Sequence, residues 1–391
     1  MKIALNRVII SIYVLCVYLF NKVHNRYRKG TALIIAPHIF GDATLLLATF
    51  QSYVDFYKEK GIKVKLLCRP AILKFMRDVA PLPESLFIEA VDFTKLVNNF
   101  KYFREASKKY RHEAEIVIAP GTSMSVELLA TTFPTNERYA FAQGKRNFWP
   151  PQIYLFFKLA YTDIIFPPID MMQIQRHRML MNHLGMKEYK GHMAHFYKLD
   201  PVITGDYCVI CPGSSMAFKC WPLERFCEVT DWIVENYNLD VHVCGGGKEE
   251  EAMANELIRK SRNKDRVTSH VNKTSFKEWS SIVQHAKFVF GNDSATIHIA
   301  AATQRPSISI AGAYDKNQFF PYAVDEMAPG DVLPVTLLKD PACRNCRTKS
   351  YRAGYGNEVC AMRIKEGLCA KCIDDISIEE AETAIRTVLR G

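Results

Sequence analysis

The chain has 391 residues, which is too long for one simple domain and fits two domains of ordinary size. With 48% hydrophobic and 24% charged residues it is predicted to be globular, which excludes a disordered or fibrous protein. The net charge of +10 favours acidic partners, namely nucleotides, phosphorylated glycolipids, an anionic membrane face or nucleic acid. Charge alone does not choose among these partners.

Twelve cysteines are present, and they lack the even spacing of a small secreted domain held by disulfides. Five of them cluster late in the chain. The other seven are scattered, mostly in apolar contexts, and are predicted to be buried thiols: Cys16, Cys68, Cys208, Cys211, Cys220, Cys227 and Cys244. This pattern favours a reducing, cytosolic compartment.

The N-terminal segment, residues 1–29, combines an apolar run with positive charges at both ends. Residues 8–20 are apolar except for Ser11, and basic residues lie before and after them. Thirteen residues are fewer than the ~20 that span a bilayer, and no small-residue cleavage site of a signal peptide follows. We therefore expect a helix on the cytoplasmic face of a membrane, with its cations near anionic head groups. The alternative is a helix packed on the protein itself.

The N-terminal half, residues 30–170, alternates short apolar strands with helices, which predicts a parallel, doubly wound α/β domain. The expected strands are residues 31–36, 62–67, 86–88 and 115–119, and the expected helices include 43–57 and 94–110. Gly41 and Asp42 follow the first strand, where Gly41 permits a tight turn. Asp42 then faces the crevice at the strand ends. A helix cap and a catalytic base are both compatible with this position.

Residues 171–200 are predicted to link this half to a second one and to contain one helix. The C-terminal half, residues 201–375, again alternates strands with helices and predicts a second doubly wound domain. A C-terminal helix is expected within residues 376–391.

Three loops at strand ends of the C-terminal half carry groups suited to a ligand. Ser214, Ser215 and Lys219 offer hydroxyls, amides and a cation, which are the groups that bind phosphate. Asp293 and Ser294 lie between a buried strand and an Ala-rich helix, whose first-turn amides form a natural anion site. An Asp293 that only caps its helix is the alternative.

The third loop is a triple glycine that precedes an acidic helix start. Gly245 and Gly246 let a ring or a ribose approach the backbone closely, and Glu249 or Glu250 would accept hydrogen bonds from ribose hydroxyls. Each of the three loops is a weak signal alone, but parallel strands place all three at one edge of the sheet. The sequence lacks a GxGxxG motif after the first strand, a Walker lysine motif and an Asp-x-Asp motif. NAD-type, P-loop and metal-bridged nucleotide-sugar sites are therefore unsupported.

Four motifs, in their order along the chain, resemble glycosyltransferase family nine, the heptosyltransferases. They are Phe40-Gly41-Asp42, Pro212-Gly213-Ser214-Ser215 with Lys219-x-Trp221-Pro222, Gly245-Gly246-Gly247, and Asn292-Asp293-Ser294 with His298-x-Ala300-Ala301 and Arg305-Pro306. The resemblance covers residues 30–385. It implies a GT-B fold, in which two Rossmann-like domains face each other across a cleft.

The resemblance also implies an inverting, metal-independent transfer of a heptose or related sugar from a nucleotide-sugar donor. The acceptor would be a saccharide or glycolipid of lipopolysaccharide or another cell-surface glycan, at the cytoplasmic face of the inner membrane. By motif match, Asp42 would be the general base. The donor-binding residues would be Ser214, Ser215 and Lys219 at the phosphates, Gly245, Gly246, Glu249 and Glu250 at the ribose, and Asp293, Ser294, Ala295 and His298 at the sugar and diphosphate.

The motifs depart from the family pattern at several positions. Ala295 stands where the family often has glycine, and Cys220 stands where a basic residue is usual. The first strand ends in Ala36-Pro37-His38 rather than in an arginine. These departures concern the donor sugar and the acceptor more than the type of reaction.

The late cysteines lie in a predicted insert, residues 341–373. Cys343 and Cys346 form one CxxC pair, Cys369 and Cys372 form another, and Cys360 lies between them as a substitute ligand. Two such pairs predict a structural zinc whose surrounding cations face a phosphorylated acceptor. Reduced thiols without a metal are the alternative.

Rival functions remain open at this point. The first is a basic zinc-ribbon protein that binds nucleic acid, but the motifs lie at strand ends rather than on a basic aromatic surface, so no nucleic acid is expected. The second is a sugar-nucleotide epimerase on the same fold, and the third is a non-catalytic binding member of the family.

Overall fold

A computed structural model describes residues 2–24, 30–121, 123–141, 151–168, 170–323, 327–341 and 358–390. The chain divides into two compact units. Unit 1 consists of Met1–Arg77, Leu82–Pro168 and Arg176–Gly191, and unit 2 of Asp78–Pro81, Ile169–Gln175 and His192–Gly391. The segment predicted as a linker, residues 171–200, is thus shared between the two units and carries helix α9 (Gln173–His183).

Unit 1 is built on a six-stranded, fully parallel sheet with the order β3-β2-β1-β4-β5-β6. Its strands are β1 (Thr31–Ala36), β2 (Lys63–Cys68), β3 (Leu86–Ala90), β4 (Ile116–Ala119), β5 (Glu137–Phe141) and β6 (Asp163–Ile165). Its helices are α1 (Lys2–His24), α2 (Phe40–Leu47), α3 (Phe50–Glu59), α4 (Pro70–Val79), α5 (Phe93–Asn98), α6 (Phe100–Tyr110), α7 (Met124–Thr131) and α8 (Pro151–Ala160), together with α9.

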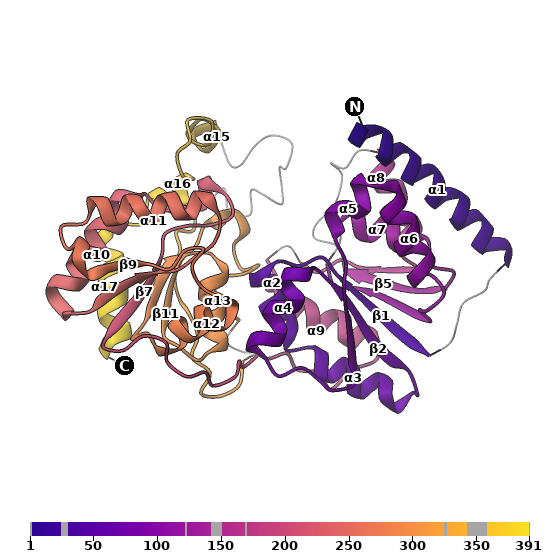
Figure 1. The fold of residues 1–391 in the computed structure, drawn as a ribbon, viewed down its shortest axis with the longest axis horizontal. Helices are drawn as coiled ribbons and strands as arrows, with labels where there is room; N and C mark the ends of the chain where they lie inside the picture. Colours follow the sequence, from indigo (N-terminus) through magenta and orange to yellow (C-terminus); the bar gives the residue numbers. More distant parts are fainter. Residues whose placement is uncertain are drawn as a thin grey trace. The chain divides into compact units, whose positions relative to one another are not determined.

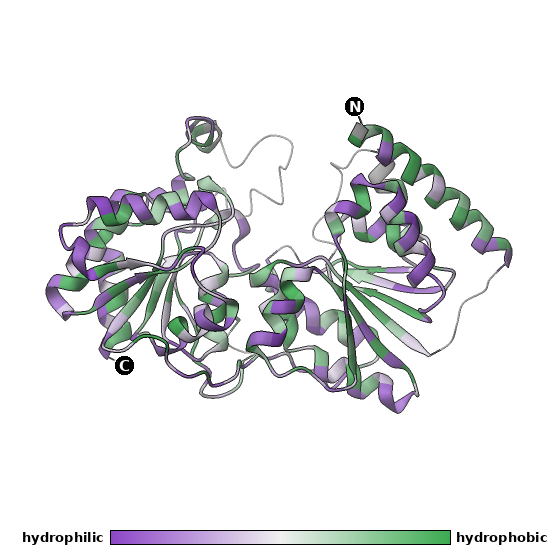
Figure 2. Ribbon diagram, viewed as in Figure 1, coloured by the Kyte–Doolittle hydropathy of each residue, from purple (hydrophilic) through white to green (hydrophobic). Residues whose placement is uncertain are grey.

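Helices cover both faces of this sheet, as a parallel sheet with apolar strands requires. In Figure 1, α5 to α8 lie over one face, whereas α2, α3, α4 and α9 lie over the other. The central strands β1 and β4 are hydrophobic along their length (Figure 2), and Leu33, Ile34 and Ile35 of β1 are fully buried. The predicted strands of unit 1 are therefore present within one or two residues of their expected bounds.

Two helices that the sequence predicted as continuous are broken. The expected helix 43–57 is divided at Ala48 and Thr49 into α2 and α3. The expected helix 94–110 is divided at Asn99, whose backbone is extended (φ −137°, ψ 107°) and whose side chain accepts a hydrogen bond from the backbone N–H of Tyr102. Asn99 therefore ends α5 and caps α6. An Asn side chain readily accepts hydrogen bonds from nearby backbone N–H groups, which favours a helix start over a helix interior.

Unit 2 repeats the same topology with the sheet order β12-β11-β10-β7-β8-β9, again fully parallel. Its strands are β7 (Tyr207–Cys211), β8 (Asp240–Val243), β9 (Val267–Ser269), β10 (Val289–Asn292), β11 (Ser307–Ile310) and β12 (Val335–Leu337). Its helices are α10 (Leu223–Tyr237), α11 (Lys248–Lys260), α12 (Phe276–His285), α13 (Ala295–Ala302), α15 (Glu358–Lys365), α16 (Lys371–Asp374) and α17 (Ile378–Arg390). Three short 3-10 turns are η1 (Ala217–Lys219), η2 (Lys264–Arg266) and η3 (Ala313–Asp315).

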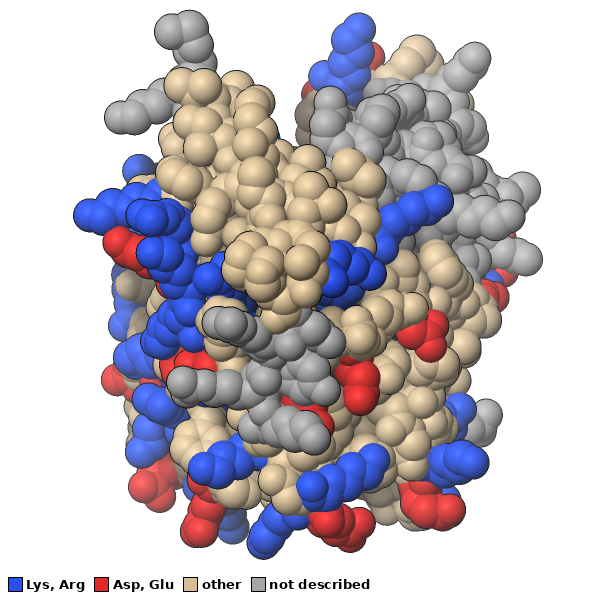
Figure 3. Space-filling view, turned by 90° about the vertical axis from the view of Figure 1, so that its right-hand side faces the viewer, with Lys and Arg blue, Asp and Glu red and all other residues tan. Residues whose placement is uncertain are grey.

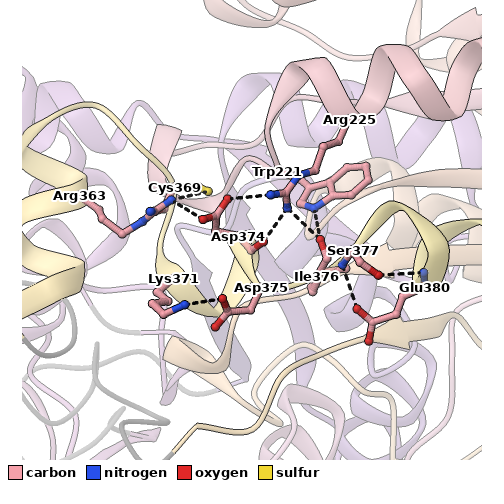
Figure 4. Close-up of polar contacts among 10 residues, drawn as sticks. All are labelled: Trp221, Arg225, Arg363, Cys369, Lys371, Asp374, Asp375, Ile376, Ser377 and Glu380. Carbon is pink, nitrogen blue, oxygen red and sulfur yellow. Dashed lines mark hydrogen bonds and ion pairs between the residues drawn. The ribbon is translucent and has the colours of Figure 1, made fainter.

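The C-terminal segment is fastened to α10 by a cluster of polar contacts around Arg225 (Figure 4). The Arg225 guanidinium donates to the backbone carbonyls of Asp374 (2.5 Å) and Ile376 (2.9 Å) and pairs with the Asp374 carboxylate at 3.2 Å. The indole N–H of Trp221 donates to the same Ile376 carbonyl at 2.9 Å. From there α17 packs on α10, β11 and β12. This segment is therefore part of the core of unit 2.

Helix α1 begins and ends well outside the predicted apolar run of residues 8–20. Its Ile3–His24 portion is long and apolar enough to cross a membrane, judged by length and composition alone. One of its faces packs on α5, α6 and α7 of unit 1. This face of α1 is therefore packed on the protein itself, which was the alternative prediction. Contact of the helix with a membrane stays a prediction.

Candidate functional site

In both sheets the order in which successive strands are added reverses at the equivalent position. β1 pairs with β4 in unit 1, and β7 pairs with β10 in unit 2, while the next strands along the chain lie on opposite sides. These pairs are topological switch points, and the crevice at their carboxyl ends is where doubly wound domains bind ligands. The predicted Ser214 and Asp293 loops follow β7 and β10, so the fold brings them together in unit 2. Asp42 follows β1 at the switch point of unit 1.

A buried ion pair lies at the switch point of unit 2. Lys219, at the end of η1, places its Nζ 3.2 Å from Oδ2 of Asp293, and the two side chains are only 8% and 12% exposed. The Lys219 ammonium also lies 5.3 Å from the ring centroid of Tyr314. A buried lysine is costly unless it is paired. Asp293 and the face of Tyr314 therefore hold the cation at the ends of the strands.

Asn292 connects the three chain segments that form this site. It is fully buried, its Nδ2 donates to the carbonyl of Pro212 (2.6 Å), and its Oδ1 accepts from the backbone N–H of Trp221 (3.0 Å). Ser214 adds a further link, because its Oγ donates to the Asp293 carbonyl at 3.0 Å. In sequence, Asn292 stands out only as part of a motif. Its structural role could have been suspected from its place as the last residue of a buried strand, next to Asp293.

Ser294 precedes the first residue of α13 and leaves the start of this helix without a side-chain cap. Its backbone is extended (φ −148°, ψ 168°), and its Oγ is buried with no hydrogen-bond partner among the described residues. The first-turn N–H groups of a helix have no partners within the helix, and the helix dipole adds positive potential there. Ser294 and the half-buried Ala295 therefore lie at a helix start whose positive potential suits an anion, next to the Lys219–Asp293 pair.

The glycine loop after β8 is organised by Glu250. One carboxylate oxygen of Glu250 accepts a hydrogen bond from the backbone N–H of Gly246 at 2.8 Å. A Cβ atom at Gly213 or at Gly245 would collide with the Glu250 side chain, which would then have to move out of the loop. Burial raises the pKa of Glu250 above its ordinary value. Glu249 is exposed by contrast, so it is the freer of the two for an incoming ribose.

His298 lies inside unit 2 rather than on its surface. Its Nδ1 is 2.6 Å from the hydroxyl of Tyr322, and its ring stacks on Phe320 with a centroid distance of 4.9 Å. Burial lowers the pKa of His298 to about 4, so the ring is neutral at physiological pH. Its assignment to the donor site stays a prediction.

At the switch point of unit 1, Asp42 occupies the first turn of α2 and is half-buried. His38, four residues earlier, is buried and packs on the loop after β4, where a Cβ atom at Gly121 would lie 2.8 Å from His38 Nε2. The ring of His177 from α9 lies 6.3 Å from that of His38, centroid to centroid. Burial lowers the pKa values of His38 and His177 to about 4 and about 3. In sequence, His38 stands out only as a departure from the family pattern.

The late cysteines lie partly outside the described residues, which include neither Cys343 nor Cys346. Cys360, Cys369 and Cys372 are buried in the core of unit 2. The backbone N–H of Lys371 donates to Cys360 Sγ at 3.4 Å, and Arg363 donates to Cys369 Sγ at 3.8 Å. Within the described part of the chain, no group of three or more His, Cys, Asp or Glu side chains is placed to hold a metal ion. The zinc site stays a prediction.

Two doubly wound parallel domains of identical strand order, with the buried Lys219–Asp293 pair at the switch point of the second, form a GT-B architecture. Solved structures share this fold: a family 9 glycosyl transferase from Veillonella parvula has a TM-score of 0.62 at 13% identity and covers 93% of this chain and 98% of that one. The E. coli heptosyltransferase WaaC with ADP-2-deoxy-2-fluoro heptose has a TM-score of 0.57 at 15% identity and covers 91% and 99%.

The sequence model for glycosyltransferase family 9 (heptosyltransferase) matches residues 104–332, and the chain belongs to this family. Lipopolysaccharide heptosyltransferase 3 of Escherichia coli K12 is 37% identical to it over 113 residues. That alignment spans 29% of this chain and 33% of the relative.

Proposed function

We propose that this protein transfers a heptose or a related sugar from a nucleotide-sugar donor to a saccharide or glycolipid acceptor in the synthesis of lipopolysaccharide or another cell-surface glycan. The observation that carries the proposal is the buried pair of Lys219 and Asp293 beside the start of α13. Family membership supports the reaction type, and the ADP-heptose analogue named with the E. coli heptosyltransferase makes an ADP-linked heptose the first donor to test.

In the proposed reaction the donor diphosphate binds between Lys219 and the first turn of α13. The leaving nucleoside diphosphate gains negative charge in the transition state, and a fixed cation with aimed N–H donors stabilises that charge without a metal ion. Binding of the diphosphate gives Lys219 a second anionic partner. The Asp293 carboxylate is then available to accept hydrogen bonds from hydroxyls of the donor sugar, and Ser214 and Ser215 flank the phosphates.

Asp42 is the proposed general base that removes the proton of the acceptor hydroxyl. Its place in the first turn of α2 stabilises the carboxylate, because the positive end of the helix dipole lies there. Attack on the anomeric carbon from the side opposite to the leaving group would invert the configuration. A positioned base of this kind contributes about 10²–10⁴-fold in rate.

The test is a transfer assay with ADP-heptose, a panel of other nucleotide sugars and a heptose-deficient lipopolysaccharide acceptor, with and without EDTA. We expect transfer to persist in EDTA and to fall at least about a hundredfold in Asp42→Asn, with donor affinity unchanged by calorimetry. Transfer by Asp42→Asn at the parental rate would show that another group is the base. Interconversion of the nucleotide sugar without any acceptor would favour the epimerase alternative.

We also propose that the late cysteines hold a structural zinc. The support is the set of candidate ligands: two Cys-x-x-Cys pairs and Cys360 supply enough thiols for a zinc site, and Cys360, Cys369 and Cys372 lie in one cluster of unit 2. Elemental analysis of the purified protein should find about one equivalent of metal, and Cys369→Ser should lower that content. A metal content near zero in both proteins contradicts the proposal.

A further inference from the structure

Helix α1 is apolar around its circumference, although only one of its faces packs on unit 1. Ile10, Val14 and Val17 form the packed face and are 0%, 0% and 7% exposed. Large apolar side chains recur at the same helical spacing on the opposite side and are more than a third exposed: Leu5, Val8, Ile9, Ile12, Leu19, Phe20 and Val23. Such a helix normally has apolar surroundings on all sides. The outer face of α1 is thus a continuous apolar surface without a cover in this chain's described residues.

Polar and aromatic contacts hold α1 in place along its length. Near the start, the Arg7 guanidinium donates to Oδ1 of Asn98 at 3.2 Å, and near the end Asn21 donates to the carbonyl of Thr132 at 2.8 Å. In the middle, the ring of Tyr13 makes edge-to-face contacts with two aromatic rings of α6. A helix that crosses a bilayer would break all of these contacts and expose the packed face. The arrangement therefore favours a helix that lies parallel to a surface.

Cations border the outer face of α1. The helix has no acidic residue, and it carries the exposed side chains of Arg7 and Lys22 near its two ends. Its neighbour α6 exposes Lys101, Arg104 and Lys108, which follow one another at three- and four-residue spacing. Figure 3 faces the side of the molecule on which α1 lies, and it shows an area without charged side chains that is bordered by Lys and Arg. An apolar strip between cations matches the chemistry of an anionic lipid surface.

We propose that the outer face of α1 docks unit 1 on an anionic bilayer, with the helix in the plane of the head groups. Its apolar side chains would enter the boundary with the acyl chains, and the cations of α1 and α6 would contact lipid phosphates. A twofold dimer through this face is a poorer match, because the same cationic borders would then face each other. The proposal goes beyond the proposed function, since it depends on neither the donor nor the acceptor.

The experiment measures binding of the purified full chain to vesicles by co-sedimentation. One set of vesicles is pure phosphatidylcholine and the other contains about one third phosphatidylglycerol. The apolar variant is Leu19→Gln with Val23→Gln, the charge variant is Lys101→Gln with Lys108→Gln, and the matched control is Val202→Gln, an exposed apolar residue of unit 2. All substituted side chains are exposed, and thermal unfolding checks that each variant is folded.

We expect the parent to bind the anionic vesicles and to be released by an alkaline carbonate wash. The apolar variant should bind at least about tenfold more weakly. The charge variant should lose its preference for anionic over neutral vesicles, and the control should bind like the parent. Three results overturn the proposal: no binding of the parent to anionic vesicles, equal binding of the apolar variant, or retention of the parent in the carbonate-washed membrane. Dimerisation of the parent without lipid that the apolar variant abolishes would assign the face to a second copy instead.

Discussion

The two units have the same strand order, but their switch points differ in electrostatic character. In unit 2 the crevice holds a buried cation, Lys219, in contact with Asp293. In unit 1 it holds Asp42 near two buried histidines, His38 and His177, which are neutral because burial lowers their pKa values. The topology therefore fixes where each site lies, and the loop residues decide its charge. A fixed cation beside a helix start suits a diphosphate, whereas the proton acceptor proposed for unit 1 is the carboxylate of Asp42.

The largest effect should come from breaking the ion pair of unit 2. Lys219→Met leaves Asp293 buried without its cation, and removal of one partner of a buried pair costs about 3–5 kcal/mol. The free energy of unfolding, measured with urea, should fall by that order, and ADP binding should become undetectable by calorimetry. The double variant Lys219→Met with Asp293→Asn should recover much of the stability but none of the ADP binding. Loss of stability without loss of ADP binding would separate the pair from the proposed donor site.

A second prediction tests the neutral histidines of unit 1 by pH. The folded pKa of His177 is about 3 and that of His38 about 4, both below the ordinary 6.5, so the unfolded chain binds protons that the folded chain does not. Their contribution to stability is therefore complete above pH 6.5 and is lost as the pH falls from 6.5 towards 4. Urea unfolding at pH 7.5 and pH 5 should show a decrease of about 4 kcal/mol at the lower pH, about 2 kcal/mol from each ring.

The variant His177→Phe, which retains an aromatic ring, is the control for this pH dependence. It should reduce the difference between the two pH values, because one of the buried titrating rings is gone. His298 of unit 2 has a folded pKa of about 4 and contributes with the same sign, as does His242 of the same unit, so His298→Phe measures the contribution of His298 alone. A pH dependence that neither substitution changes would mean that other groups control acid stability.

The most apolar strands were predictable from sequence, whereas several short or partly polar strands were not. β1 and β7 are apolar runs that are buried on both faces, and this pattern is unambiguous. The strands β5, β6, β9 and β12 were missed, because they are short or mix polar with apolar residues, as Val-Thr-Ser in β9 does. Edge strands need less apolar sequence, so their identity depends on pairing with distant segments, which the sequence does not display.

The sequence was enough to predict where the loops of the candidate site lie, but not which of their side chains contact each other. The motif loops were expected at the strand ends, and the structure places them there. The pairing of Lys219 with Asp293 joins residues 74 positions apart, so no local pattern could reveal it. The choice between Glu249 and Glu250 was equally open in sequence, because both lie in the same helical turn. Only packing against Gly213 and Gly245 shows that Glu250 points into the loops.

The smallest effects are expected from substitution of two glycines, one at each switch point. In unit 2, a Cβ atom at Gly291 would lie 2.5 Å from the carbonyl oxygen of Cys211, in the backbone of the neighbouring strand β7. In unit 1, a Cβ atom at Gly121 would meet the imidazole of His38, a side chain that can rotate. Gly291→Ala should therefore cost about 1–3 kcal/mol of unfolding free energy, because two paired strands must separate. Gly121→Ala should cost less, because only a side chain must move.

Urea unfolding of both variants, followed by ADP binding, measures this difference. Separation of β10 from β7 shifts Asp293 away from the Ser214 loop, so Gly291→Ala should also weaken ADP binding. Gly121→Ala should leave ADP binding at the parental value, because it acts in the other unit. An equal loss of ADP affinity in both variants would contradict the assignment of the donor site to unit 2 alone.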